Sequence, residues 1–93
     1  MKKLAVEDVR LALKETQYPS VWEKAEKMPD DDLKKACFRT DFSMDSLDVI
    51  ELSMSLEREL SVSIPDSAIA TYISKGGTVQ ALIDVFNTTI ESL

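Results

Sequence analysis

The residue in this sequence whose type and position could best support chemistry is a serine at the start of an acidic segment. Ser46 stands between Asp45 and Leu47, where a polar stretch gives way to a helical pattern. At the first turn of a helix, unpaired backbone N–H groups and the positive end of the helix dipole stabilise a phosphate group. Most serines at such positions only cap the helix, so position alone favours capping.

The negative charge of the chain is concentrated around this serine. Residues 41–66 include seven Asp and Glu side chains and one Arg, while the rest of the chain has ten acidic and ten basic side chains. The formal net charge of −6 therefore lies within this one segment. Such a surface indicates basic protein partners and excludes nucleic acid, because phosphate binding needs a basic face.

The composition also limits the chemistry that the chain can perform. It has no histidine, which removes Ser-His-Asp and Cys-His catalysis and every His-containing zinc site. We therefore expect a protein that is not an enzyme. The single cysteine, Cys37, cannot form an internal disulfide, and we find neither a signal peptide nor an apolar run of membrane-spanning length. These features predict a cytoplasmic protein that does not bind a membrane.

A calcium-binding loop is an alternative interpretation of the polar stretch, since Asp41, Ser43 and Asp45 have the spacing of its first ligands. The sixth position of that loop needs glycine and is Ser46 here. The twelfth needs a bidentate glutamate and is Leu52. The sequence therefore predicts no EF-hand and no metal site.

Apolar periodicity predicts an all-α fold: a small four-helix bundle in a single domain of 93 residues. The four longer helices are expected at about residues 3–17, 46–60, 66–74 and 79–90. A long loop between the first two should contain one or two short helices. These are expected near residues 20–27, where the helix ends before Pro29, and after the acidic run that starts at Asp30.

The helix that follows Ser46 has two apolar stripes. The first has the spacing of a core-facing stripe and consists of Val49, Leu52, Ser53, Leu56 and Leu60. The second is interleaved with carboxylates and consists of Leu47, Ile50 and Met54. This second stripe is either a docking surface, with apolar contacts for affinity and charge for steering, or a surface covered by the long loop. The pattern leaves both interpretations open.

Three short motifs make the sequence resemble the acyl carrier protein family. They are Asp45-Ser46-Leu47 with its acidic helix, Ile64-Pro65-Asp66 and Thr78-Val79-Gln80. The resemblance is best from Asp41 to Asp84 and extends to the first helix. It implies an acyl-carrier-like bundle formed by a single domain over residues 1–93, and it reverses the interpretation of Ser46 from a cap to an attachment point.

The resemblance implies that Ser46 carries 4′-phosphopantetheine through a phosphodiester, with Asp45 and Leu47 beside it. A separate phosphopantetheinyl transferase supplies this group from coenzyme A, so the serine needs no activating residue in its own chain. The arm would present acyl thioesters to acyl-transferring and synthase enzymes of fatty-acid or polyketide-type synthesis. Basic patches on these partners would contact a monomeric carrier at Asp48, Ile50, Glu51, Met54 and Glu57. An acyl chain would lie between the helices, against Leu52, Leu56, Ile64, Ile69 and Leu82.

The sequence departs from the pattern of the family at three points. Ser43 replaces a glycine, Trp22 lies in a segment that is longer than usual, and Arg58 interrupts the acidic run. These departures favour a specialised carrier over one for ordinary fatty-acid synthesis. The alternative function is a helical adaptor that binds a protein without any prosthetic group, which would need no serine at position 46.

Overall fold

The computed structural model describes residues 2–16 and 19–93, and within these ranges the chain forms helices and no strand. The helices are α1 (Val6–Thr16), α2 (Pro19–Lys27), α3 (Asp30–Lys35), α4 (Phe38–Asp41), α5 (Ser46–Leu60), α6 (Asp66–Ser74) and α7 (Val79–Glu91). The predicted all-α bundle with short helices in the first connection is confirmed. The predicted end of the first helix, at Gln17 and Tyr18, lies outside the described residues.

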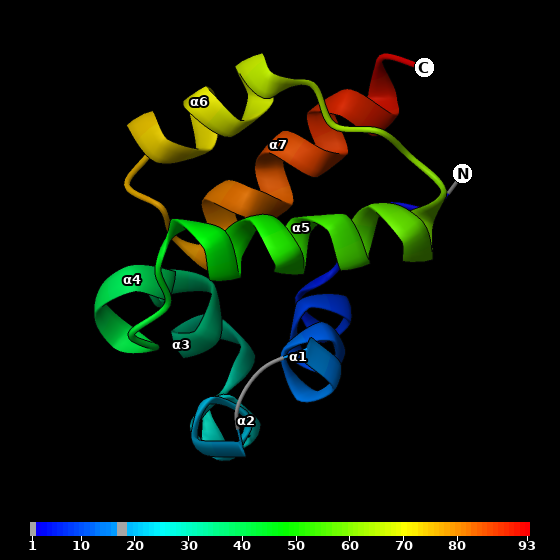
Figure 1. The fold of residues 1–93 in the computed structure, drawn as a ribbon. Coiled ribbons are helices and arrows are strands. Elements are labelled where there is room, and N and C mark those ends of the chain that lie inside the picture. Colours follow the sequence, from blue (N-terminus) through cyan, green and yellow to red (C-terminus); the bar gives the residue numbers. More distant parts are fainter. Residues whose placement is uncertain (1, 17–18) are drawn as a thin grey trace.

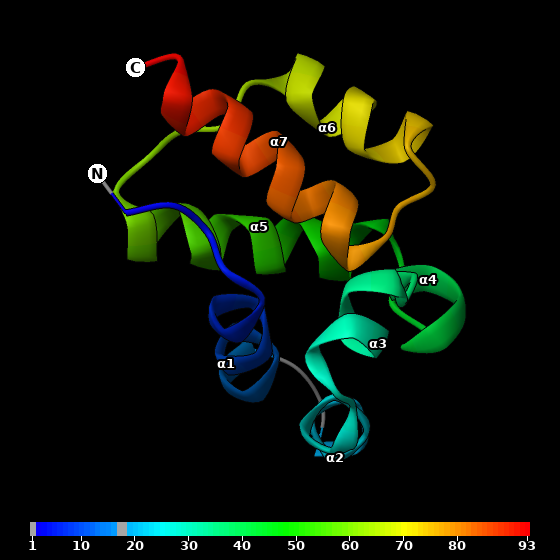
Figure 2. The ribbon, with the colours of Figure 1, turned by 180° about the vertical axis from the view of Figure 1, so that it is seen from behind.

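Helix α5 lies at the centre of the bundle. Figures 1 and 2 show α6 and α7 on one side of α5 and α1 on the other, with the first and last described residues at the same end of the bundle. Helix α1 packs against both α5 and α2, and α6 packs against α7. No helix among residues 2–16 and 19–93 has both the length and the apolar character needed to cross a membrane.

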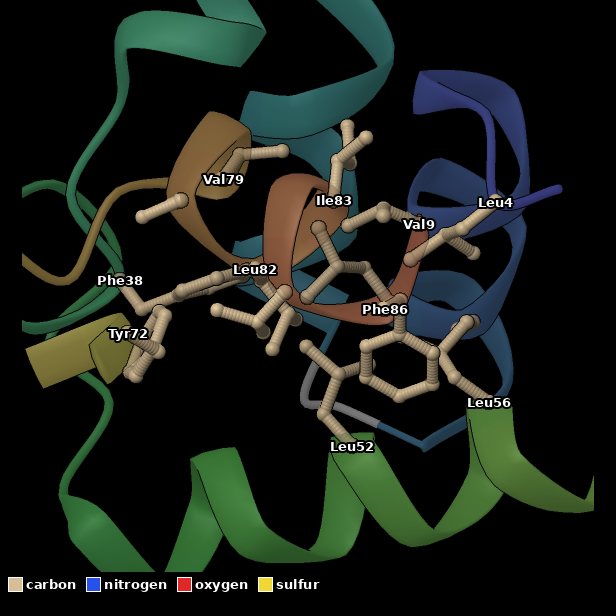
Figure 3. Close-up of a cluster of buried hydrophobic side chains, with 14 of the residues drawn as sticks. Leu4, Val9, Phe38, Leu52, Leu56, Tyr72, Val79, Leu82, Ile83 and Phe86 are labelled. Atoms are coloured by element: carbon tan, nitrogen blue, oxygen red, sulfur yellow. The ribbon is translucent and has the colours of Figure 1, made fainter. Parts of the chain in front are cut away.

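The core forms where apolar side chains of α1, α5 and α7 meet. Leu52 and Leu56 rise from α5 toward Phe86 of α7, as Figure 3 shows, and all three side chains are buried. Val9 of α1 lies on the side of Phe86 that is opposite to Leu52. Burying a side chain of this size contributes about 1.5–3 kcal/mol relative to leaving it exposed. The core-facing stripe predicted for α5 is confirmed, with Val49 partly buried at its first position.

The connection between α3 and α4 is bonded to the start of α7. The backbone N–H of Val79 donates to the carbonyl of Ala36 at 2.9 Å, and that of Phe38 donates to the carbonyl of Gly77 at 3.3 Å. Helix α4 is an additional short helix of four residues. One helical turn is too short to show a period in sequence, and its anchor, Phe38, is identified only by its complete burial.

Arg10 joins α1 to the segment that contains α2, α3 and α4, which we call the inserted segment (residues 19–41). Its Nη1 donates to the carbonyls of Ala25 at 2.6 Å and Met28 at 2.9 Å, while Nη2 pairs with Asp30. Its Nε donates to Glu7 at 2.9 Å. The side chain is 11% exposed, so the guanidinium satisfies backbone carbonyls at the end of α2 in a position with little access to water.

Ser43 adopts a left-handed backbone conformation, with φ of 54°. The Cβ atom of an L-residue is crowded there, whereas glycine is not. This explains why the family that the sequence resembles favours glycine at the position of Ser43. The strain lies in the turn that leads into α5, two residues before its N-cap.

We expect the substitution Ser43→Gly to raise the free energy of unfolding by about 1 kcal/mol, because it relieves the left-handed strain. Urea unfolding followed by circular dichroism would measure the change. Ser63→Gly is the matched control: Ser63 is also exposed and in a connector, but its φ is not positive, so this change should lower stability. A Ser43→Gly protein no more stable than wild type would contradict the expected strain.

Candidate functional site

Ser46 is the first residue of α5, and its neighbour performs the capping that a serine could have performed. The Oδ1 atom of Asp45 accepts from the backbone N–H of Asp48 at 2.9 Å, and Oδ2 of Asp48 accepts from the N–H of Asp45 at 3.1 Å. Asp45 is therefore the N-cap of α5 and forms a capping box with Asp48. The Ser46 side chain is exposed, and in the described part of the chain its hydroxyl has no hydrogen-bond partner. The hydroxyl is therefore accessible for modification.

The surroundings of Ser46 fit a phosphodiester. Helix α5 has 15 residues, and the N–H groups of its first turn lie at the serine, where they stabilise an anion. Arg39 lines the same pocket as Ser46 and supplies a cation on that side. The negative charges of Asp45 and Asp48 would repel a phosphodiester, but each carboxylate already accepts a hydrogen bond from a backbone N–H.

A pocket of about 360 Å³ opens beside Ser46, between α5 and α6. Its volume is within the range of small-molecule sites. The side chains of the two helices that line it are Val49, Ile50 and Ser53 of α5 with Ile69, Tyr72 and Ile73 of α6. Except for the hydroxyls of Ser53 and Tyr72, this part of the lining is apolar, so the pocket could shelter an aliphatic group.

The structure separates the residues predicted to shelter an acyl chain. Ile69 lines this pocket, but Leu52, Leu56, Ile64 and Leu82 do not. Leu52, Leu56 and Leu82 are packed into the core instead (Figure 3). Helical spacing identifies the apolar positions of α5, but it does not show which of them face α6 and which face α7.

The second stripe of α5 is exposed. Leu47, Ile50 and Met54 are 63%, 48% and 51% exposed, so the long connection does not cover them. The three interleaved carboxylates differ in their structural roles. Asp48 belongs to the capping box, and Glu57 Oε2 accepts from the backbone N–H of Ile64 at 3.4 Å. Glu51 has no hydrogen bond or ion pair with any described residue and is exposed.

Several side chains at the pocket were not identified as site residues from the sequence. Burial raises the pKa of Tyr72 to about 12, and its hydroxyl donates to the carbonyl of Gly77 at 3.1 Å. Hydrogen bonds with Thr40 lower the pKa of the Cys37 thiol, and the bond with the Thr40 backbone has a larger effect than the bond with its side chain. Ser53 was assigned to the core stripe, and the signal that marks it is a hydroxyl in an otherwise apolar row.

Comparisons with known proteins show the family to which the sequence belongs. The sequence profile of the family described as "Phosphopantetheine attachment site" matches residues 20–86. The acyl carrier protein of Zymomonas mobilis is 44% identical over 52 residues, which are 56% of this chain and 62% of that protein. The aligned part thus spans less than two thirds of that relative. No solved structure gives a significant match. The resemblance to acyl carrier proteins is confirmed.

Proposed function

The chain belongs to the phosphopantetheine attachment site family, and from this premise we propose that it carries acyl groups on a 4′-phosphopantetheine arm attached to Ser46. The observation that carries the proposal is the state of the Ser46 hydroxyl. It is exposed at the N-terminus of α5 and is not used to cap the helix, because Asp45 makes the capping bond. A hydroxyl in this state can be modified without loss of a structural bond.

The thiol of a bound phosphopantetheine arm supplies the group that holds an acyl chain as a thioester. The residues of this chain have other tasks. The first turn of α5 stabilises the phosphate charge at Ser46, with Asp45 and Leu47 flanking it. The adjoining pocket between α5 and α6 gives an acyl group a place away from water. None of these tasks requires a general base within the chain.

We propose that partner enzymes dock on the exposed second stripe of α5. Apolar contact would come from Leu47, Ile50 and Met54, and basic patches on the partners would face Asp48, Glu51 and Glu57. The partners would be a phosphopantetheinyl transferase and acyl-transferring or synthase enzymes of fatty-acid or polyketide-type synthesis. The longer segment before Ser46 supports a specialised pathway. The lone cysteine suits the reducing cytoplasm, where the carrier would act as a monomer.

The proposal is tested by incubating the protein with coenzyme A, magnesium and a broad-specificity phosphopantetheinyl transferase, followed by mass spectrometry of the intact chain. We expect wild type to gain the mass of one phosphopantetheine and Ser46→Ala to gain none. Ser67→Ala is the matched control, because Ser67 is also an exposed serine that follows an aspartate in the first turn of a helix. It should be modified like wild type. An unchanged wild-type mass would contradict the proposal and favour the adaptor.

A further inference from the structure

Ser53 has a buried hydroxyl without a hydrogen bond. The residue is 4% exposed, and no partner for its Oγ exists among residues 2–16 and 19–93. A serine within a helix ordinarily has a carbonyl one turn back as a local partner, which here belongs to Val49. That bond is not made. Leaving a buried hydroxyl unpaired destabilises the folded protein, whereas an alanine at the same position would carry no such cost.

The position of Ser53 relates this hydroxyl to Ser46. Both residues line the pocket between α5 and α6. They are seven residues apart on one helix, which is about two turns or roughly 10 Å along its axis. Residues at that spacing lie on nearly the same face, so the pocket follows one face of α5 from the attachment serine to Ser53. Between them the helix contributes Val49 and Ile50, which are apolar.

We infer that Ser53 hydrogen-bonds an oxygen atom on the acyl chain that the protein carries, and so selects hydroxylated or keto acyl groups over saturated ones. This inference rests on the proposed function. A serine hydroxyl both donates and accepts, so it can pair with a ketone or a hydroxyl. Across the pocket, Ile69 and Ile73 favour the hydrocarbon part of the chain. A saturated chain would leave the Ser53 hydroxyl unpaired, and one hydrogen bond of ordinary strength changes an equilibrium by about fivefold.

The test uses holo protein loaded with acyl-pantetheine groups whose chains are joined by a stable amide. The probes are octanoyl chains, plain or with a single hydroxyl group placed in turn at each odd-numbered carbon beyond the carbonyl. Nuclear magnetic resonance of the Val49 and Ser53 amides measures how much of the chain lies inside the pocket. We expect at least one hydroxylated chain to favour the inside state by about fivefold over plain octanoyl. The variant Ser53→Ala should lose this preference.

Ser55→Ala is the matched control, since Ser55 is a buried serine of the same helix that does not line the pocket. It should keep the wild-type preference. Absence of a preference in wild type at every hydroxyl position, or its persistence in Ser53→Ala, would overturn the inference. Loading is checked first by mass: failure to load would overturn the proposed function and this inference with it. Normal loading without a Ser53-dependent preference would overturn the inference alone.

Discussion

Replacing Arg10 with methionine is expected to lower the free energy of unfolding by about 3 kcal/mol. Methionine retains most of the apolar stem but removes the guanidinium that pairs with the carbonyls of Ala25 and Met28. It also leaves Glu7 and Asp30 without their cation. The free energy of unfolding of Arg10→Lys should lie between those of wild type and Arg10→Met. Lysine keeps a positive charge, but its ammonium group lacks the forked geometry that reaches all these acceptors. Urea unfolding followed by Trp22 fluorescence and by circular dichroism would measure both variants.

Arg58→Met is the matched control for Arg10. Arg58 is an exposed arginine of α5 that pairs with no described residue, so its loss should change stability by less than about 0.5 kcal/mol. If Arg10→Met were as stable as Arg58→Met, the bonds of Arg10 would contribute nothing net to the fold. A loss seen by fluorescence but not by circular dichroism would place the effect in α2 alone and contradict a cooperative role for Arg10.

Reversing the charge of Glu51 is expected to slow modification by a phosphopantetheinyl transferase by roughly 10- to 100-fold in kcat/KM at low salt. Glu51 is chosen because its side chain is exposed and has no hydrogen bond or ion pair with another described residue, whereas the carboxylates of Asp48 and Glu57 each accept a hydrogen bond from a backbone N–H. The Glu51→Lys protein should therefore keep its fold. Rising salt concentration should reduce the difference in kcat/KM between Glu51→Lys and wild type, because salt screens exposed charges.

Glu23→Lys carries the same change of charge to an exposed residue of α2, away from α5 in Figure 1. It should be modified at nearly the wild-type rate, since net charge alone is not what the partner recognises. Equal rates for Glu51→Lys and wild type would show that the acidic face of α5 is not used. A slowing shared equally by Glu23→Lys would assign the effect to overall charge.

Much of the secondary structure could be predicted from the sequence, because its signals are local. Asp45 and Asp48 are three residues apart and form the capping box without help from the rest of the fold. Thr78 likewise caps α7, accepting from the N–H of Ala81 at 3.1 Å. Gly76 and Gly77, which follow α6, have positive φ, and glycine is the usual residue where a helix ends in this conformation. Helix α4 was not predicted, because its anchor, Phe38, packs against Tyr72, which lies far along the chain in α6.

The sequence by itself determined the helical bundle, the concentration of negative charge around α5 and the presence of a serine at its start. These features depend on residue types within a few positions of one another. Only the tertiary structure decided that the second stripe of α5 is exposed, that Arg10 holds the inserted segment, and that Ser53 rather than Leu52 faces the pocket. Helical periodicity places a residue on a face, but the neighbour that covers that face comes from a distant part of the chain.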